Sequence, residues 1–139
     1  MGGPILALDA AAAACSAAVW RDGAILAQRR QAMARGHAEA LMPLVLETLQ
    51  AAGLDFPDLS RIAVGVGPGS FTGIRIALAA ARGIGLAASL PVVGVDSFSA
   101  VAAAIPEATR RGRALLVVID SKRRELFGRY YDDELNPQG

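Results

Sequence analysis

A glycine-rich segment between a predicted strand and a predicted helix constrains this fold more than any other feature of the sequence. Residues 65–75 read Gly-Val-Gly-Pro-Gly-Ser-Phe-Thr-Gly-Ile-Arg, so four of the nine residues from Gly65 to Gly73 are glycines. Glycine costs conformational entropy on folding and is favoured where φ is positive or where another group approaches the backbone closely. The segment therefore predicts a strand-to-helix turn with a ligand or another helix against its backbone.

The composition is that of one ordinary domain without a strong electrostatic field. The 139 residues include 14 basic and 13 acidic side chains, a net charge of +1. A charge this small excludes recruitment of nucleic acid by a global field, so any contact with RNA would be local or shared with a partner. The single cysteine, Cys15, excludes an intrachain disulfide, and the N-terminus shows no secretory signal pattern. We therefore expect a cytoplasmic protein.

The predicted elements follow the order βββαβαβα. Strands are expected at 4–9, 15–21, 24–31, 61–67 and 91–95. Helices are expected at 36–53, 71–89 and 97–105. The dipeptide Asp22-Gly23 is a strong signal for a two-residue hairpin, so the first three strands form an antiparallel meander. This order predicts an α/β lobe in which helices cover a mixed sheet.

The pattern restarts after residue 112. Strands at 113–120 and 125–131 form a hairpin around a charged turn at 121–124. A hairpin alone is marginal in water, so this one either pairs with the edge of the first sheet or begins a second unit. We favour the second interpretation, which divides the chain into residues 1–112 and residues 113–139.

The two long helices carry more apolar surface than one small core requires. Apolar residues cover about 200° around the helix at 36–53, whereas a helix on a single core usually shows a stripe of about 100°. A membrane span is disfavoured at 71–89, because Arg75 and Arg82 would each cost about 3 kcal/mol at a bilayer centre. We expect a protein partner, with a missing second domain as the alternative cover. The interface candidates, of which some could face the sheet, are Leu41, Leu44, Val45, Ile74, Leu78 and Ala81.

The residue inventory leaves little room for catalysis. With one histidine and one cysteine, clustered histidine sites and thiolate zinc sites are excluded. The spacing Gly67-x-Gly69-x-x-x-Gly73, with Asp96 after the next strand, is similar to a dinucleotide fingerprint. Pro68 removes one amide that could bind phosphate, and the lysine of a P-loop is missing. Asp9 and Asp96 end two predicted strands and are the candidate paired carboxylates.

Four segments of the sequence resemble the TsaB family, and together they span nearly the whole chain. They are residues 5–9, 36–39, 64–75 and 91–97. The run Gly-Pro-Gly-Ser-Phe-Thr-Gly-Ile-Arg at 67–75 is specific to that family. The resemblance implies an actin-like, ribonuclease-H-like fold of the sugar kinase and Hsp70 superfamily. It also implies relatedness to TsaD, the catalytic paralogue, and the opening hairpin of an incomplete second lobe at the end of this chain.

The resemblance also implies a function without catalysis by this chain itself. TsaB pairs with TsaD through helices of the first lobe. Together with the ATPase TsaE they transfer a threonylcarbamoyl group to the tRNA adenosine beside the anticodon. ATP and a metal would then belong to the partner complex, and tRNA would be reached through that complex. TsaD carries a metal-binding histidine pair where this chain has Ser-Phe-Ser-Ala-Val at 97–101.

Some alternatives stay open at this point. A remnant of the ancestral nucleotide site is expected at Asp9, Gly67, Gly69, Ser70 and Gly73. A nucleotide-binding enzyme that uses the loop at 67–73 is the first alternative, and a homodimeric scaffold that uses the long helices is the second. Lys122, Arg123 and Arg124 are either an exposed charged turn or a local contact to tRNA.

Overall fold

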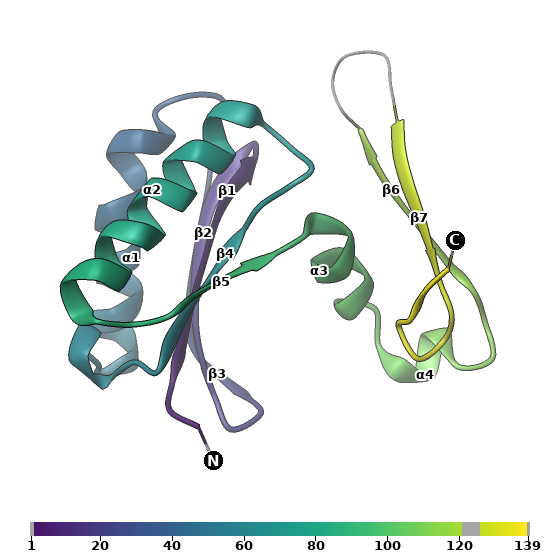
Figure 1. Cartoon of the computed structure of the whole chain (residues 1–139), viewed down its shortest axis with the longest axis horizontal. Helices are drawn as coiled ribbons and strands as arrows, with labels where there is room; N and C mark the ends of the chain where they lie inside the picture. The colour runs from purple at the N-terminus through teal and green to yellow at the C-terminus, as the bar shows by residue number, and fades with distance from the viewer. Residues whose placement is uncertain (1, 121–125, 139) are drawn as a thin grey trace.

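The computed structural model describes residues 2–120 and 126–138, which form a helix-covered sheet and a smaller hairpin unit (Figure 1). The strands are β1 (Ile5–Ala12), β2 (Ala14–Arg21), β3 (Ala24–Ala32), β4 (Arg61–Gly65), β5 (Val92–Val95), β6 (Leu115–Asp120), β7 (Leu126–Tyr131) and β8 (Pro137–Gln138). The helices are α1 (His37–Ala52), α2 (Phe71–Ala88), α3 (Ser97–Ala103) and α4 (Glu107–Arg110), with a 3-10 turn η1 (Phe56–Asp58). The predicted elements are confirmed, whereas η1, α4 and β8 are additional. The predicted charged turn at 121–124 lies outside the described residues.

The first sheet has five strands in the order β3-β2-β1-β4-β5. The meander β1-β2-β3 is antiparallel, and Asp22 and Gly23 take φ values of 50° and 84° at its tight turn. Strand β4 pairs parallel to β1, and β5 pairs parallel to β4. Parallel neighbours require long crossovers, which α1 and α2 supply. The expected mixed sheet is therefore present.

Both long helices lie side by side on one face of this sheet (Figure 1). Alternate residues of β1, Leu6, Leu8 and Ala10, are buried beneath them, as period-2 alternation requires. Helix α1 has glycines in the left-handed region at both ends, Gly36 and Gly53. The positive φ at Gly53 supplies the C-cap that the sequence predicted.

The buried side of α2 consists of residues small enough to let the sheet approach. Four buried residues spaced four apart form this stripe: Gly73, Ala77, Ala81 and Gly85. A Cβ on Gly73 would overlap the carbonyl oxygen of Ala10, and a Cβ on Gly85 would lie 2.7 Å from Cγ2 of Val92. The small residues on this side therefore serve the core of the chain itself.

Gly73→Ala is expected to lower the free energy of unfolding by about 2 kcal/mol, because overpacking against a backbone atom cannot be relieved by a rotamer change. Gly83→Ala is the matched control on the same helix, since a Cβ there would meet nothing within 4 Å. The control should raise the free energy of unfolding by about 1 kcal/mol. Urea unfolding followed by circular dichroism measures both values. Equal effects of the two substitutions would contradict the close contact between α2 and β1.

Helix α3 packs on the hairpin of β6 and β7 rather than on the first sheet. A second buried cluster joins Phe98 and Ala102 of α3 to Val117 and Tyr131 of the hairpin. The hairpin forms its own three-stranded sheet in the order β6-β7-β8, as expected for a second unit. Helix α3, which precedes the predicted division at residue 112, therefore shares a buried cluster with the hairpin that follows it. A periodic pattern assigns α3 an apolar face but does not say which sheet covers it.

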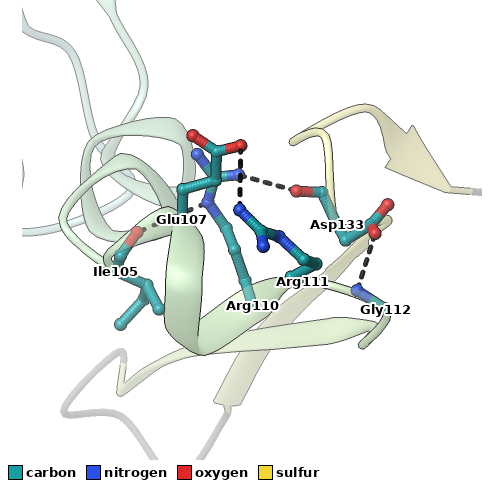
Figure 2. Close-up of polar contacts among 6 residues, drawn as sticks. All are labelled: Ile105, Glu107, Arg110, Arg111, Gly112 and Asp133. Atoms are coloured by element: carbon teal, nitrogen blue, oxygen red, sulfur yellow. Dashed lines mark hydrogen bonds and ion pairs between the residues drawn. The ribbon is translucent and has the colours of Figure 1, made fainter.

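A polar network holds the segment after α4 against the turn that leads to β8 (Figure 2). Arg110 donates from Nη1 to the carbonyl oxygen of Asp133 at 2.6 Å and from Nε to that of Ile105 at 3.4 Å. The amide of Gly112 donates to Oδ2 of Asp133 at 2.7 Å. These bonds fix the turn, whereas the exposed ion pair Arg111–Glu107 at 4.0 Å contributes little.

Asp96 lies at the junction of the two units. Its carboxylate accepts hydrogen bonds from the amide and the hydroxyl of Ser99, both at 2.7 Å, and so caps α3. The Arg129 guanidinium of β7 lies 3.7 Å from Asp96 Oδ1, and its Cζ lies 4.9 Å from the centre of the Phe98 ring. Burial raises the pKa of Asp96, but the Ser99 hydrogen bonds and Arg129 outweigh it, so the pKa lies below its ordinary value.

Asp96→Asn is expected to destabilise the chain at neutral pH but not in strong acid. The folded-state pKa of Asp96 is lowered, so its carboxylate stabilises the fold above the unfolded value of about 3.9. That contribution is lost as the pH falls through the folded-state pKa. Asparagine keeps the N-cap but has no charge for Arg129. Thermal unfolding across the acidic range measures the difference, and a difference independent of pH would contradict this role of the Asp96 charge.

Candidate functional site

The glycine-rich turn connects β4 to α2 and is attached to the C-terminal end of β1. Gly67 has a φ of +90°, in the region that glycine adopts without strain, and the Gly67–Pro68 peptide bond is cis. The Ser70 amide donates to the carbonyl oxygen of Ala11 at 2.7 Å. The Ser70 side chain caps α2 by accepting a hydrogen bond from the Gly73 amide at 3.1 Å. Hydrogen bonds to Ala11 and within the first turn of α2 therefore hold the glycine-rich turn in place.

The space beside the glycines is filled by the C-terminal end of β1. A Cβ on Gly65 would overlap the carboxylate of Asp9, and a Cβ on Gly69 would lie 2.6 Å from the carbonyl oxygen of Ala11. The third contact is the one between Gly73 and Ala10 described above. The sequence predicted close approach by a ligand or a helix, whereas the structure shows approach by the segment from Asp9 to Ala11.

Asp9 lies on the face of the sheet opposite to α1 and α2. Its Oδ1 accepts a hydrogen bond from the Ala11 amide at 2.6 Å, while Asp96 bonds to Ser99 and Arg129. The two predicted carboxylates therefore each have partners of their own. The ladder partners place Asp9, Ser16 and Arg30 in one row across the sheet, with Gly65 against the Asp9 carboxylate. These four residues border an open cavity of about 520 Å³. Cys15 is buried, and burial followed by the Asp9 charge raises the pKa of its thiol.

The residues of the predicted nucleotide remnant lie at the turn, but two of its amides are already engaged. Gly67, Gly69, Ser70 and Gly73 belong to the turn and the start of α2, and Asp9 lies against Gly65 just before it. However, the Ser70 and Gly73 amides, which could face a phosphate at the start of α2, already donate to protein oxygens. Among residues 2–120 and 126–138, no group of three or more histidine, cysteine, aspartate or glutamate side chains could hold a metal ion.

Four of the six predicted interface residues are buried inside the chain. Leu41, Leu44, Val45 and Ala81 are 1%, 6%, 0% and 0% exposed and belong to the main core. Ile74 and Leu78 are half-buried. This corrects the expectation for the four core residues, because a side chain enclosed by its own sheet cannot contact a partner. The sequence left open which part of the apolar arc of α1 faces the sheet, and the structure places Leu41, Leu44 and Val45 in the core and Leu46 outside it.

The exposed side of the two helices carries other residues, among them two leucines, that the sequence analysis did not name as interface candidates. We call the following five residues the outer helix face: Leu46 of α1, and Arg75, Ala79, Arg82 and Leu86 of α2. Leu46 is 52% exposed and Leu86 is 86% exposed. The helical period could have found Leu86, since it lies nearly opposite the stripe of Gly73, Ala77, Ala81 and Gly85.

Helix α2 is long and apolar enough to span a membrane by length and composition alone. Its stripe of small residues is nevertheless packed against the sheet, with Gly73, Ala77 and Ala81 buried. That packing is typical of the core helix of an α/β domain.

Comparison with known proteins assigns the family. The TsaD family, described as tRNA N6-adenosine threonylcarbamoyltransferase, matches residues 26–134. The protein named tRNA threonylcarbamoyladenosine biosynthesis protein TsaB of Escherichia coli (strain K12) is 37% identical over 134 residues, which are 95% of this chain and 56% of that protein. This chain belongs to the TsaD family and is similar to its TsaB members. The resemblance stated from the sequence is thereby confirmed.

Two further similarities bear on the fold and on the relation to TsaD. A solved structure of YeaZ from Pseudomonas aeruginosa is 31% identical with a TM-score of 0.84, covering 99% of this chain and 65% of that one. A tRNA N6-adenosine threonylcarbamoyltransferase of Erythrobacter litoralis is 40% identical over 63 residues, 45% of this chain and 18% of that enzyme. The family match and the YeaZ structure are consistent with the expected actin-like, ribonuclease-H-like fold. The chain spans less than two thirds of the length of these proteins.

The segment at 97–101 makes structural contacts in this chain. The Ser97 amide donates to the carbonyl oxygen of Gly67 at 2.7 Å, which attaches the start of α3 to the glycine-rich turn. Ser99 bonds to Asp96, and Phe98 is buried against the hairpin. The family resemblance aligned this segment with the metal-binding motif of TsaD. In this chain the segment connects the first sheet to the hairpin unit.

Proposed function

We propose that this chain is a non-catalytic subunit that binds and activates a TsaD-like enzyme in threonylcarbamoyladenosine modification of tRNA. The observation that carries the proposal is the outer helix face, on which Leu46 and Leu86 are 52% and 86% exposed. Large apolar side chains at the exposed side of packed helices are typical of a protein interface. The TsaB relatives and the TsaD family match support a complex of this kind.

The remaining components of the proposed system lie outside this chain. ATP and a metal are bound by the partner complex, a TsaE-like ATPase joins it, and tRNA is contacted through it at the adenosine beside the anticodon. The engagement of two amides at the start of α2 supports this division, because the Ser70 and Gly73 amides already donate to oxygens of the chain. We place the complex in the cytoplasm, where tRNA is modified.

Reconstitution tests the proposal directly. The full chain is added to the TsaD-like enzyme and TsaE-like ATPase of the same organism with ATP, magnesium, threonine-derived substrate and tRNA, and modified adenosine is measured by mass spectrometry. We expect product only when the chain is present, and a one-to-one complex of chain and enzyme by light scattering. Product formation at an unchanged rate without the chain would refute the proposal.

Two controls separate the alternatives. Calorimetry of the isolated chain with ATP and magnesium should give no binding heat, whereas a nucleotide-binding enzyme would bind and turn over ATP. A homodimeric scaffold would give a dimer that persists when the enzyme is added. In our proposal any dimer of the isolated chain dissociates in favour of the complex with the enzyme.

A further inference from the structure

The outermost strand of the first sheet and the segment after it carry a basic surface away from α2. We call Arg29, Arg30 and Arg35 the basic edge, and all three residues are exposed. In the described part of the chain, β3 pairs with β2 on one side and with no strand on the other. A strand in this position presents backbone N–H and C=O groups that no ladder satisfies. The basic edge therefore combines three cations with unpaired backbone donors.

The two arginines of β3 lie on opposite faces of the sheet. Arg30 pairs with Ser16 on the face opposite to α1 and α2, whereas Arg29 pairs with Ala17, which is buried on the helix side. Nη1 of Arg29 donates to the carbonyl oxygen of Gln28 at 2.8 Å, so this guanidinium lies against the edge itself. A single elongated anion that follows the edge can therefore contact both arginines.

Acidic side chains of the described residues leave the basic edge unpaired. Residues 23–38 contain no aspartate or glutamate. Among residues 2–120 and 126–138, none of the three arginines forms an ion pair. In the basic run after α4, by contrast, Arg111 pairs with Glu107, and Arg110 donates to the carbonyl oxygen of Asp133. The basic edge is therefore a local positive surface on a chain whose net charge is only +1.

The side chains along this edge fit a chain of phosphates better than a protein. Arginine, glutamine and backbone N–H groups are the donors that proteins use on phosphate oxygens. An arginine can also hold one phosphate by two parallel hydrogen bonds. The core of a protein interface is depleted of charged residues, whereas residues 28–31 read Gln-Arg-Arg-Gln. This composition favours a nucleic-acid backbone as the occupant.

We infer that the basic edge contacts the sugar-phosphate backbone of the RNA substrate while the TsaD-like enzyme is bound elsewhere on the chain. The inference rests on the proposed function, which brings tRNA to the complex, and it assigns part of the RNA contact to this chain. Helix α1 packs on β2 and β3, whereas α2 packs on β1 and β4. None of the three arginines belongs to the outer helix face, so enzyme and RNA can be bound at the same time.

The double variant Arg29→Gln with Arg30→Gln tests the inference by removing two charges from an exposed strand. The chain is assembled with the TsaD-like enzyme of the same organism, and the anisotropy of labelled tRNA is measured from about 50 to 200 mM salt. We expect the dissociation constant for tRNA to rise about tenfold. The slope of its logarithm against the logarithm of the salt concentration should fall by about 0.7 to 0.9 for each lost phosphate contact. Arg29→Lys with Arg30→Lys keeps both charges and should keep the slope.

Arg61→Gln with Arg113→Gln is the matched control, because both arginines are exposed and lie outside β3. It removes the same charge and should leave the affinity for tRNA and its salt slope at the wild-type values. Wild-type affinity and slope of Arg29→Gln with Arg30→Gln, or an equal loss in the control, would overturn the inference while the proposed function stands. Weaker binding of the β3 double variant to the enzyme in calorimetry would mean that the edge contacts protein, and would also overturn it. Failure of the wild-type chain to bind the enzyme would remove both.

Discussion

Replacing Leu86 with glutamate is expected to abolish binding to the TsaD-like enzyme while leaving the chain folded. Leu86 is 86% exposed on α2, so a charge there costs nothing in the isolated chain. In a complex the same carboxylate would be enclosed without a partner, which costs several kcal/mol and raises the dissociation constant more than about 100-fold. Light scattering and calorimetry of chain and enzyme measure the loss, and thermal unfolding of the chain alone confirms that the fold is retained.

The matched control for this substitution is Ala51→Glu, which places the same charge on an exposed position of α1 outside the outer helix face. It should bind with wild-type affinity. A second variant, Leu46→Glu, tests the same face from the other helix and should also lose binding. If Leu86→Glu and Leu46→Glu both bound as tightly as the wild type, the partner would have to use another surface.

Leu41→Ala is expected to lower the free energy of unfolding by about 3 kcal/mol, the usual cost of a cavity at an enclosed leucine. Leu41 is 1% exposed and packs in the main core. Leu46→Ala on the same helix is the control, because Leu46 is 52% exposed and its truncation should cost less than about 0.5 kcal/mol. Urea denaturation of both variants measures the difference.

The same pair of variants distinguishes the core from the interface by a second readout. Leu46→Ala should weaken binding to the enzyme at unchanged stability, whereas Leu41→Ala should lose stability in the isolated chain. An unstable Leu46→Ala variant together with a stable Leu41→Ala variant would mean that the helix is rotated from the orientation described here. Light scattering of each variant with the enzyme completes the comparison.

The elements and their pairing could be predicted because local chemistry decides them. Asp22-Gly23 favours one kind of hairpin, Gly53 ends α1 in the left-handed region, and Ser70 caps α2. These signals depend on a few neighbouring residues, so they can be recognised without knowing the rest of the fold. The family-specific run at 67–75 then identified the group to which the chain belongs, as the comparisons confirm.

The division of the chain and the outward side of its helices could not be predicted in the same way. The apolar faces of α3 and α1 are visible in the sequence, but the surface that covers each depends on contacts between distant residues. Phe98 shares a buried cluster with Tyr131, so α3 packs with residues beyond the predicted division at residue 112. Because α1 is apolar over more than half of its circumference, its pattern alone allows Leu41 or Leu46 to face the core.

The sequence by itself determined the order of strands and helices, the strand-to-helix turn at 65–73 and the family, since turn chemistry and glycine placement are properties of short segments. Only the tertiary structure decided what the glycines are for. Gly65, Gly69 and Gly73 lie against the segment from Asp9 to Ala11, some sixty residues earlier in the chain, whereas Gly83 faces open space. A glycine in a sequence indicates that something must come close, and only the packing of distant segments shows whether that neighbour is the chain itself or a partner.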